Sequence, residues 1–266
     1  KSYYFQRFSI PLEEQFAGKW SRPASALQPV VIHPSAADDK RFAGTAVSSP
    51  RGWIDAGDYN KYIVNSGITT ATLLMAYTDA APVFSRTVLD IPESGNQLPD
   101  LLDEILWNLR WMLTMQDPGD GGVYHKCTNA QFDGMVMPHE PTVTRYLVQK
   151  STAAALDFAA VTARASRVFE AFRKELPGLA DSCRQASRNA WQWAKEHPAV
   201  IYDQPALNRS YDPDIATGTY GDGTITDEWL WAAAELSVTF KDESYLIGLD
   251  LAPAGPDPVP AWNDVR

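Results

Sequence analysis

Residues 52–62 read Gly52-Trp53-Ile54-Asp55-Ala56-Gly57-Asp58-Tyr59-Asn60-Lys61-Tyr62 and lead directly into a helical pattern. Adjacent Gly and Asp residues favour a turn, so this stretch predicts a loop that presents two carboxylates among aromatic side chains. From Asn65 to Asp79, apolar residues then recur at i, i+3, i+7 and i+8, at Ile68, Ala71, Met75 and Ala76. This period predicts an amphipathic helix. The loop is therefore expected at the mouth of a helical scaffold.

The same helical period dominates the rest of the chain. It predicts helices over 65–79, 98–115, 152–176, 180–196 and 227–240. Pro177-Gly178 and His197-Pro198 end the third and the fourth of them. Loops rich in Gly, Pro and Asp separate the helices, and no strand pattern of comparable strength occurs. Helices that alternate with long loops predict an all-α fold, a barrel or toroid whose loops gather at one end.

Composition limits the classes of partner. The chain has 266 residues, of which 45% are hydrophobic and 21% charged, enough to build a sizeable core. Its formal net charge of −10 disfavours nucleic acid and anionic membrane surfaces, so neither is expected as a partner. No stretch approaches the ~18 apolar residues of a membrane span. The many aromatic residues supply flat rings that pack in a core or stack on sugar faces.

The two cysteines, Cys127 and Cys183, are too few for a disulfide framework and match no metal-binding spacing. Two unpaired, partly buried thiols are the default expectation, and one disulfide between them is the alternative. The sequence contains no signal peptide and starts at Lys1 rather than Met. Either a leader was removed or an upstream region is not included.

Asp55 and Asp58 are the candidate catalytic pair. They stand three residues apart around Ala56-Gly57. Two acids in an aromatic-rich setting are what acid–base hydrolysis of a sugar bond requires. On these four residues alone, a solvated Asp-Gly turn without a catalytic role is the simpler interpretation.

Further segments, in a consistent order, favour the catalytic interpretation. They are Lys1-Ser2-Tyr3-Tyr4-Phe5-Gln6-Arg7, Ser48-Ser49-Pro50-Arg51, the run from Tyr59 to Gly67, Asp100-Leu101-Leu102-Asp103-Glu104-Ile105, Gly121-Gly122-Val123-Tyr124-His125-Lys126, Met135-Val136-Met137-Pro138 and the run from Asp227 to Leu236. Together with the Asp-Ala-Gly-Asp loop they resemble glycoside hydrolase family 9 over essentially the whole chain. The resemblance implies an (α/α)6 barrel around a cleft. It also implies hydrolysis of β-1,4-linked glucans with inversion at the anomeric carbon.

The resemblance assigns the two aspartates separate roles. Inversion requires one carboxylate to deprotonate the attacking water, and an acid on the other face of the sugar to protonate the departing oxygen. Asp58 matches the family's base. Asp55 matches the aspartate that helps to position the same water, and a loop-bracing hydrogen-bond acceptor is its alternative role.

Four further residues are candidates for substrate binding. His125 ends a segment that resembles a loop whose His contacts sugar hydroxyls near the cleavage point, although a lone His is often structural. Tyr124, Trp53 and Tyr220 are candidate stacking residues, with core packing as the alternative for each.

The resemblance also bears on metal binding. Some members carry a zinc site of two Cys and two His before the catalytic loop, but residues 1–54 contain no Cys and a single His, His33, so that site cannot form. Members can bind structural calcium at the segment matching Asp227-Glu228, with Asp264 as a further candidate ligand. The helix dipole favours the same acidic first turn with no metal present. No cofactor is required for the reaction.

A β-1,4-glucanase, secreted or periplasmic, is the leading functional interpretation. Within the family, the alternative is an exo-acting β-glucosaminidase on chitosan oligomers, whose cationic substrate would suit the negative charge. A non-catalytic carbohydrate-binding relative is a third interpretation from a different class. Such a binder would have no need to retain Asp55 and Asp58.

The number of predicted helices is about half of what a full barrel needs. The final residues, 261–266, resemble the beginning of a family helix that should continue. The family's general acid, a Glu, has no match here, and an active isolated chain would need Glu93, Glu104, Glu140 or Glu228 instead. We therefore predict one catalytic domain over 1–266, incomplete at its C-terminus, holding the first half to two-thirds of the barrel. It should depend on the remaining C-terminal part of the barrel for solubility and activity.

Overall fold

The computed structural model describes residues 1–25 and 29–249. Its long helices are α2 (Ile63–Asp79), α4 (Asp100–Thr114), α5 (Thr152–Phe169), α6 (Leu179–Glu196) and α8 (Thr226–Phe240). The predicted helices are confirmed, and the largest boundary difference is in α5. It ends at Phe169 and continues only as a short 3-10 helix, η4 (Glu170–Phe172). The helix start predicted at 261–266 lies outside the described residues.

Short helical segments lie before, between and after these long helices. They are η1 (Ser2–Gln6), α1 (Glu14–Ala17), η2 (Gly18–Trp20), η3 (Pro34–Ala36), α3 (Ala81–Phe84), α7 (Gln204–Asn208) and η5 (Glu243–Leu246). Within the described ranges, no helix combines the length and apolarity needed to cross a bilayer. Cys127 and Cys183 are both buried and unpaired, which confirms the default expectation for the thiols.

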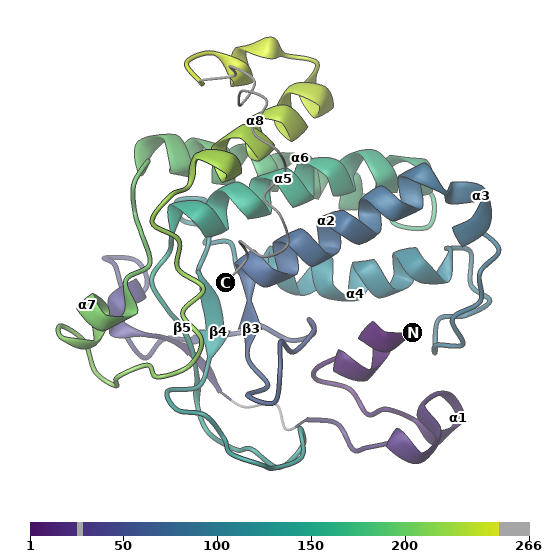
Figure 1. The fold of residues 1–266 in the computed structure, drawn as a ribbon, viewed down its shortest axis with the longest axis horizontal. Coiled ribbons are helices and arrows are strands. Elements are labelled where there is room, and N and C mark those ends of the chain that lie inside the picture. Colours follow the sequence, from purple (N-terminus) through teal and green to yellow (C-terminus); the bar gives the residue numbers. More distant parts are fainter. Residues whose placement is uncertain (26–28, 250–266) are drawn as a thin grey trace, which may run out of the picture.

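Helix α5 is the centre of the helical layer. It packs against α2, α6 and α8, and Figure 1 shows these helices lying side by side in the upper half of the view. Its many alanines have little side chain to hold neighbours apart, and nearly all of the helix is buried. At the contact with α2, a Cβ on Gly67 would lie only 3.2 Å from the Cβ of Asp157. The hydroxyl of Ser151 caps α5 by accepting a hydrogen bond from the Ala154 N–H.

A small sheet lies at one end of this layer and corrects the all-α prediction. Its strand order is β2-β1-β5-β4-β3, with β1 and β5 parallel and the other neighbours antiparallel. The strands are β1 (Val30–Ile32), β2 (Ala46–Val47), β3 (Lys61–Tyr62), β4 (Lys126–Thr128) and β5 (Arg145–Leu147). Each has only two or three residues, too few to show an alternating pattern in the sequence. They form because buried loop backbone must pair its N–H and C=O groups.

The sheet brings the beginnings of two helices together. Strand β3 runs directly into α2, and the Ile63 N–H donates to the carbonyl oxygen of His125 at 3.1 Å. The His125 N–H donates in turn to the carbonyl oxygen of Gln149, just before α5. Figure 1 shows β3, β4 and β5 next to one another below these helices. The loop that contains Asp55 and Asp58 leads into β3, and so it lies at the edge of the sheet that this strand forms.

Candidate active site

The segment before the two aspartates is tied tightly to the core. Gly52 has φ +83°, and a Cβ there would lie 2.7 Å from Cγ of Trp111, so only glycine fits. The ammonium of Lys61 is buried and donates to the carbonyl oxygens of Ser49 at 2.9 Å and Arg51 at 2.7 Å. Burial lowers the pKa of Lys61 to about 7. The aspartates therefore project from a backbone that is anchored before and after them.

The carboxylate of Asp58 is held by neutral donors. It is 7% exposed, and its Oδ2 accepts from the Tyr62 hydroxyl at 2.6 Å and from Nδ2 of Asn60 at 3.1 Å. Its Oδ1 accepts from the backbone N–H of Asn60 at 3.2 Å. Burial and this hydrogen bond raise the pKa of Tyr62, so the phenol stays protonated and donates. A contacting cation would weaken Asp58 as a base, and no residue in the described ranges forms a salt bridge with it.

Asp55 is half-buried and is held by two residues that are distant in sequence. Its Oδ1 accepts from Nδ2 of Asn65 at 2.9 Å, and its Oδ2 accepts from the Tyr220 hydroxyl at 2.6 Å. The hydrogen bond to Asp55, together with burial, raises the pKa of Tyr220. These contacts suit both predicted roles of Asp55, because a braced carboxylate also holds a fixed position from which to orient water.

The loops predicted to converge do so. Tyr220, from the loop before α8, contacts Asp55. The carbonyl oxygen of the adjacent Thr219 lies 2.9 Å from Nε2 of His125. The rings of Tyr62 and Tyr220 meet edge to face at 4.7 Å. Beside them lies a pocket of about 220 Å³, lined by Tyr3, Gln6, Trp53, Ile54, Asp55, Tyr62, Asn65, Ser66 and Thr69. Asp55 thus stands at an open cavity as well as in the loop.

Two of the predicted aromatic residues differ in their surroundings. Tyr220 is 44% exposed beside Asp55, so its stacking role stays a prediction. Trp53 lines the pocket but is only 4% exposed. Its ring lies 4.6 Å from that of Tyr3, and its Nε1 donates to Oε1 of Glu104 at 2.8 Å. These contacts favour core packing, the alternative role, for Trp53.

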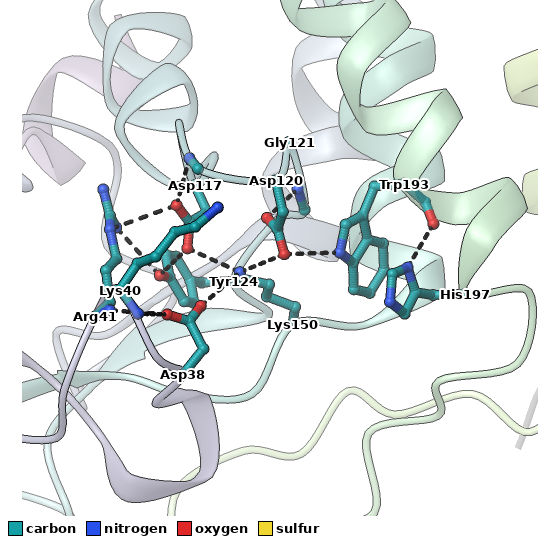
Figure 2. Close-up of polar contacts among 12 residues, drawn as sticks. Asp38, Lys40, Arg41, Asp117, Asp120, Gly121, Tyr124, Lys150, Trp193 and His197 are labelled. Atoms are coloured by element: carbon teal, nitrogen blue, oxygen red, sulfur yellow. Dashed lines mark hydrogen bonds and ion pairs between the residues drawn. The ribbon is translucent and has the colours of Figure 1, made fainter.

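The stacking prediction for Tyr124 is wrong, because no part of this residue is exposed. Its hydroxyl donates to Oδ2 of Asp117 at 2.8 Å and accepts from Nη1 of Arg41 at 3.1 Å. Figure 2 shows the tyrosine inside a polar cluster in which Lys150 lies between Asp117, Asp38 and Asp120. Tyr124 therefore braces a charged network and presents no face to a ligand.

His125 is likewise interior, at 1% exposure. Its Nδ1 lies 2.8 Å from the Ser151 hydroxyl, its Nε2 lies 2.9 Å from the Thr219 carbonyl oxygen, and its ring stacks on Tyr202 at 4.2 Å. Burial lowers the pKa of His125 to about 4, so the ring is neutral near pH 7. Both nitrogens have protein partners, so the structure supports the structural alternative over contact with a sugar.

The candidate calcium residues lie where α8 begins. Glu228 is buried, and its Oε2 has no hydrogen-bond partner among the described residues. Burial and the neighbouring Asp227 raise the pKa of Glu228 to about 7. Burial, with Glu228 and Asp227 nearby, raises the pKa of Asp157 well above its ordinary value. Within residues 1–25 and 29–249, no group of three or more His, Cys, Asp or Glu side chains is arranged to hold a metal, and Asp264 lies outside these ranges.

Several partners of the two aspartates were not singled out from the sequence. Asn60 and Tyr62 follow Asp58 at two and four residues, and an Asp-x-Asn spacing is a detectable turn signal. Arg145 contacts Oδ1 of Asn60 at 2.6 Å from a separation of 85 residues, and no local pattern could have identified it. In the sequence, Asn65 is the first residue of the predicted helix over 65–79, and no pattern there marks it as a partner of Asp55.

Comparison with known proteins identifies the family of this chain. The model of the family described as glycosyl hydrolase family 9 matches residues 1–255. A xyloglucan-specific endo-beta-1,4-glucanase of Bacteroides ovatus is 52% identical over 246 residues, which are 92% of this chain and 42% of that protein. Endoglucanase D of Acetivibrio thermocellus is 39% identical over 203 residues, 76% of this chain and 31% of the relative.

A solved structure gives the same result for the fold. A Bacteroides ovatus GH9 structure superimposes with a TM-score of 0.91 at 52% identity, over 92% of this chain and 45% of that chain. The chain thus spans less than half the length of these relatives. By the family match over nearly its whole length, this chain belongs to glycosyl hydrolase family 9.

Proposed function

We propose that this chain supplies the base side of an active site that hydrolyses β-1,4-glycosidic bonds in glucans with inversion. The environment of Asp58 is the observation that supports this best. Its carboxylate contacts neutral donors within the described structure, and Asp55, three residues earlier in the chain, lines an open pocket. Such a carboxylate can accept a proton from water, because no described residue forms a salt bridge with it and the positive charges of Lys126 and Arg145 act on it only from a distance. The Bacteroides ovatus relative is named as an endo-beta-1,4-glucanase, that is, for the same type of bond.

In this proposal, the O–H bond of a water molecule breaks as its proton passes to Asp58, while Asp55 orients that water. The water oxygen attacks the anomeric carbon from the face opposite the leaving group. An acid on the other face protonates the departing oxygen, so the glycosidic bond breaks with inversion. Protons balance because Asp58 gains one and the acid loses one.

We infer that the acid and the rest of an (α/α)6 barrel come from a part of the protein beyond this chain. The chain spans 42% of the Bacteroides ovatus relative's length. Ile68 and Met75 of α2 and Val238 of α8 are exposed apolar side chains that such a part would cover. Within the chain, Glu104 and Glu93 are both held by Arg7, at 3.1 Å and 2.9 Å, which makes them braces rather than acids.

Xyloglucan is the first substrate to test, because the 52% identical relative is named for it. The complete polypeptide that carries these residues would be assayed for reducing-sugar release from xyloglucan and carboxymethylcellulose, and for glucosamine release from chitosan oligomers. We expect release from a β-glucan and none from the chitosan oligomers. Glucosamine release would favour the glucosaminidase alternative. Oligosaccharide binding by calorimetry without turnover would favour the non-catalytic binder.

The stereochemistry of the product tests the mechanism separately. Proton NMR of the newly formed reducing end should show the α-anomer first, before mutarotation. An initial β-anomer would exclude a mechanism in which Asp58 activates water for direct attack.

Two further features are proposals that follow from the same function. Polymeric glucans do not cross membranes, so we expect the enzyme to be secreted or periplasmic. Structural calcium at Asp227 and Glu228 would require ligands such as Asp264 outside the described residues. A chelator should then lower the unfolding temperature, and adding calcium should restore it.

A further inference from the structure

Asn60 contacts both oxygens of Asp58. Its backbone N–H donates to Oδ1 at 3.2 Å, and its side-chain Nδ2 donates to Oδ2 at 3.1 Å. The Asn60 side chain is completely buried. Because the two donors reach the two oxygens, they fix the plane of the Asp58 carboxylate as well as its position.

The direction of the Asn60 amide is set by more distant residues. Its Oδ1 accepts from Nη1 of Arg145 at 2.6 Å and from the Asn129 N–H at 3.0 Å. Its Nδ2 gives its second hydrogen to Oδ1 of Asn129 at 2.8 Å. Asn129 is oriented in turn, because its own Nδ2 donates to Asp133 at 2.6 Å. A flipped Asn60 amide would set donor against donor and acceptor against acceptor, so its nitrogen must face Asp58.

This arrangement leaves the two oxygens of Asp58 unequal. Oδ2 accepts two hydrogen bonds, from Tyr62 and Asn60, whereas Oδ1 accepts one from the described residues. A carboxylate oxygen has about two acceptor sites, so Oδ2 is filled and Oδ1 keeps one for a water molecule. Oδ1 is therefore the atom of Asp58 that is placed to receive a proton.

We propose that Asn60 is the positioning residue that aims Oδ1 of Asp58 at the attacking water, and that Arg145 fixes the Asn60 amide in the direction this requires. The inference rests on the proposed role of Asp58 as the base. Asn60 and Arg145 exchange no protons in the step. The proton passes from water to Oδ1, and the Asn60 clamp keeps the carboxylate from turning away.

Other charged or titratable groups also face Asp58. They come from several elements: Tyr62, Lys126, Arg145 and Tyr220. The ammonium of Lys126 is already bound by Gln204, Thr217 and Gly218, so it cannot replace the Asn60 donor without breaking these contacts. Each of these groups remains in the chain when Asn60 alone is changed, but Arg145 loses its hydrogen bond to Oδ1 of Asn60, so the folding of each variant is measured together with its kinetics.

The test uses Asn60→Leu and Asn60→Asp in the complete polypeptide, assayed on the glucan that it hydrolyses. Asn60→Leu should lower kcat by roughly 10- to 100-fold, as for other groups that orient a catalytic residue, with KM within about threefold. KM should stay nearly unchanged because Asn60 is completely buried and has no exposed surface that a sugar could contact. Asn60→Asp places a second carboxylate beside Asp58. The acidic limb of the pH profile of kcat should therefore move up by about one pH unit.

Asn208 offers a matched control. Its amide likewise both accepts and donates, accepting from the Ile215 N–H at 3.0 Å and donating to the Ile215 carbonyl oxygen at 2.9 Å, and its hydrogen bonds within the described structure do not involve Asp58. Asn208→Leu and Asn208→Asp should lower the unfolding temperature but leave kcat and its acidic limb unchanged. A merely structural role for Asn60 would give this same pattern.

The outcomes distinguish failure of the Asn60 clamp from failure of Asp58 as the base. An active wild type, an inactive Asp58→Asn variant and a folded Asn60→Leu variant with kcat within about threefold of wild type would overturn the clamp alone. An active Asp58→Asn variant would instead overturn Asp58 as the base. If Asn60→Leu does not fold, Asn60→Ser carries the same test, because it keeps the backbone N–H and removes Nδ2.

Discussion

Two loops of this protein have the same Asp-x-Gly-Asp pattern and opposite surroundings: Asp55-Ala56-Gly57-Asp58 and Asp117-Pro118-Gly119-Asp120. In the second loop, Asp117 lies 2.8 Å from Nζ of Lys150 and 3.4 Å from Nε of Arg41, and Asp120 also contacts Lys150 at 2.8 Å (Figure 2). In the first loop, the hydrogen bonds to the carboxylates come from Asn and Tyr residues.

The difference lies in what the partners do to the charge. Burial alone would raise the pKa of Asp117, but hydrogen bonds from Lys150, the Gly119 N–H and the Tyr124 hydroxyl outweigh it, and the pKa is lowered. A carboxylate held in its charged form by cations braces a fold and makes a weak base. Neutral donors orient a carboxylate without forming a salt bridge, and around Asp58 the positive charges of Lys126 and Arg145 act only from a distance. The Asp-x-Gly-Asp pattern thus marks a turn, and the partners of its carboxylates decide between a structural and a chemical role.

The largest expected effect is on activity in the first loop. Asp58→Asn should lower kcat by roughly 10²–10⁴-fold, because the nearly isosteric amide cannot take a proton from water. The unfolding temperature should change by only a few degrees, since no salt bridge is lost in the described structure. Steady-state kinetics and thermal unfolding of the complete polypeptide measure both. Activity within tenfold of wild type would remove Asp58 from the role of base.

The matching change in the second loop should act on stability instead. Asp117→Asn leaves Lys150 and Arg41 near an uncharged partner, although Lys150 keeps Asp120, so we expect a loss of about 1.5–3 kcal/mol in unfolding free energy, the range for a hydrogen bond to a charged group. Denaturant titration measures this loss, and kcat of the folded variant should stay within about threefold. A large drop in kcat at unchanged stability would erase the distinction between the two loops.

Because His125, which follows the second loop, is buried, the stability of the protein should depend on pH. Burial lowers its pKa from 6.5 to about 4, so on acidification the unfolded chain binds a proton first. Its contribution is complete above about pH 6.5 and is lost progressively toward pH 4, on the order of 3 kcal/mol. His125→Gln should therefore show a smaller loss between pH 7 and pH 5 than wild type in urea titrations. Equal losses in both proteins would mean that His125 is not buried in neutral form.

The smallest expected effect concerns Tyr220. Tyr220→Phe removes one hydrogen bond from Asp55, and water can partly replace it at this exposed site, so kcat should fall by about three- to tenfold. Tyr220→Ala should also raise KM if the ring stacks on a sugar. Tyr211→Phe, in the same loop and 39% exposed, is the control that should change neither parameter. An unchanged kcat for Tyr220→Phe would show that this brace on Asp55 is dispensable.

The long helices could be predicted because their signal is local. Apolar spacing and stop signals placed α2, α4, α6 and α8 nearly as the structure has them. The sheet could not be predicted, because strands of two or three residues leave no alternating pattern. The same limit applied to aromatic roles: Tyr124 and Tyr220 belong to similar Gly-containing segments, yet one is completely buried and the other is exposed.

For the site, the sequence was sufficient for the turn that carries Asp55 and Asp58 and for its place before α2. The contacts of Asp58 with Asn60 and Tyr62 are also local, whereas the more distant contacts depend on the tertiary fold. Tyr220 reaches Asp55 across 165 residues, and Arg145 reaches Asn60 across 85. Periodicity and turn propensity act between neighbours in the chain, and so they can be read locally. Hydrogen bonds and charge pairing depend on distances of a few ångströms through space, which exist only once the helices have packed and the loops have met.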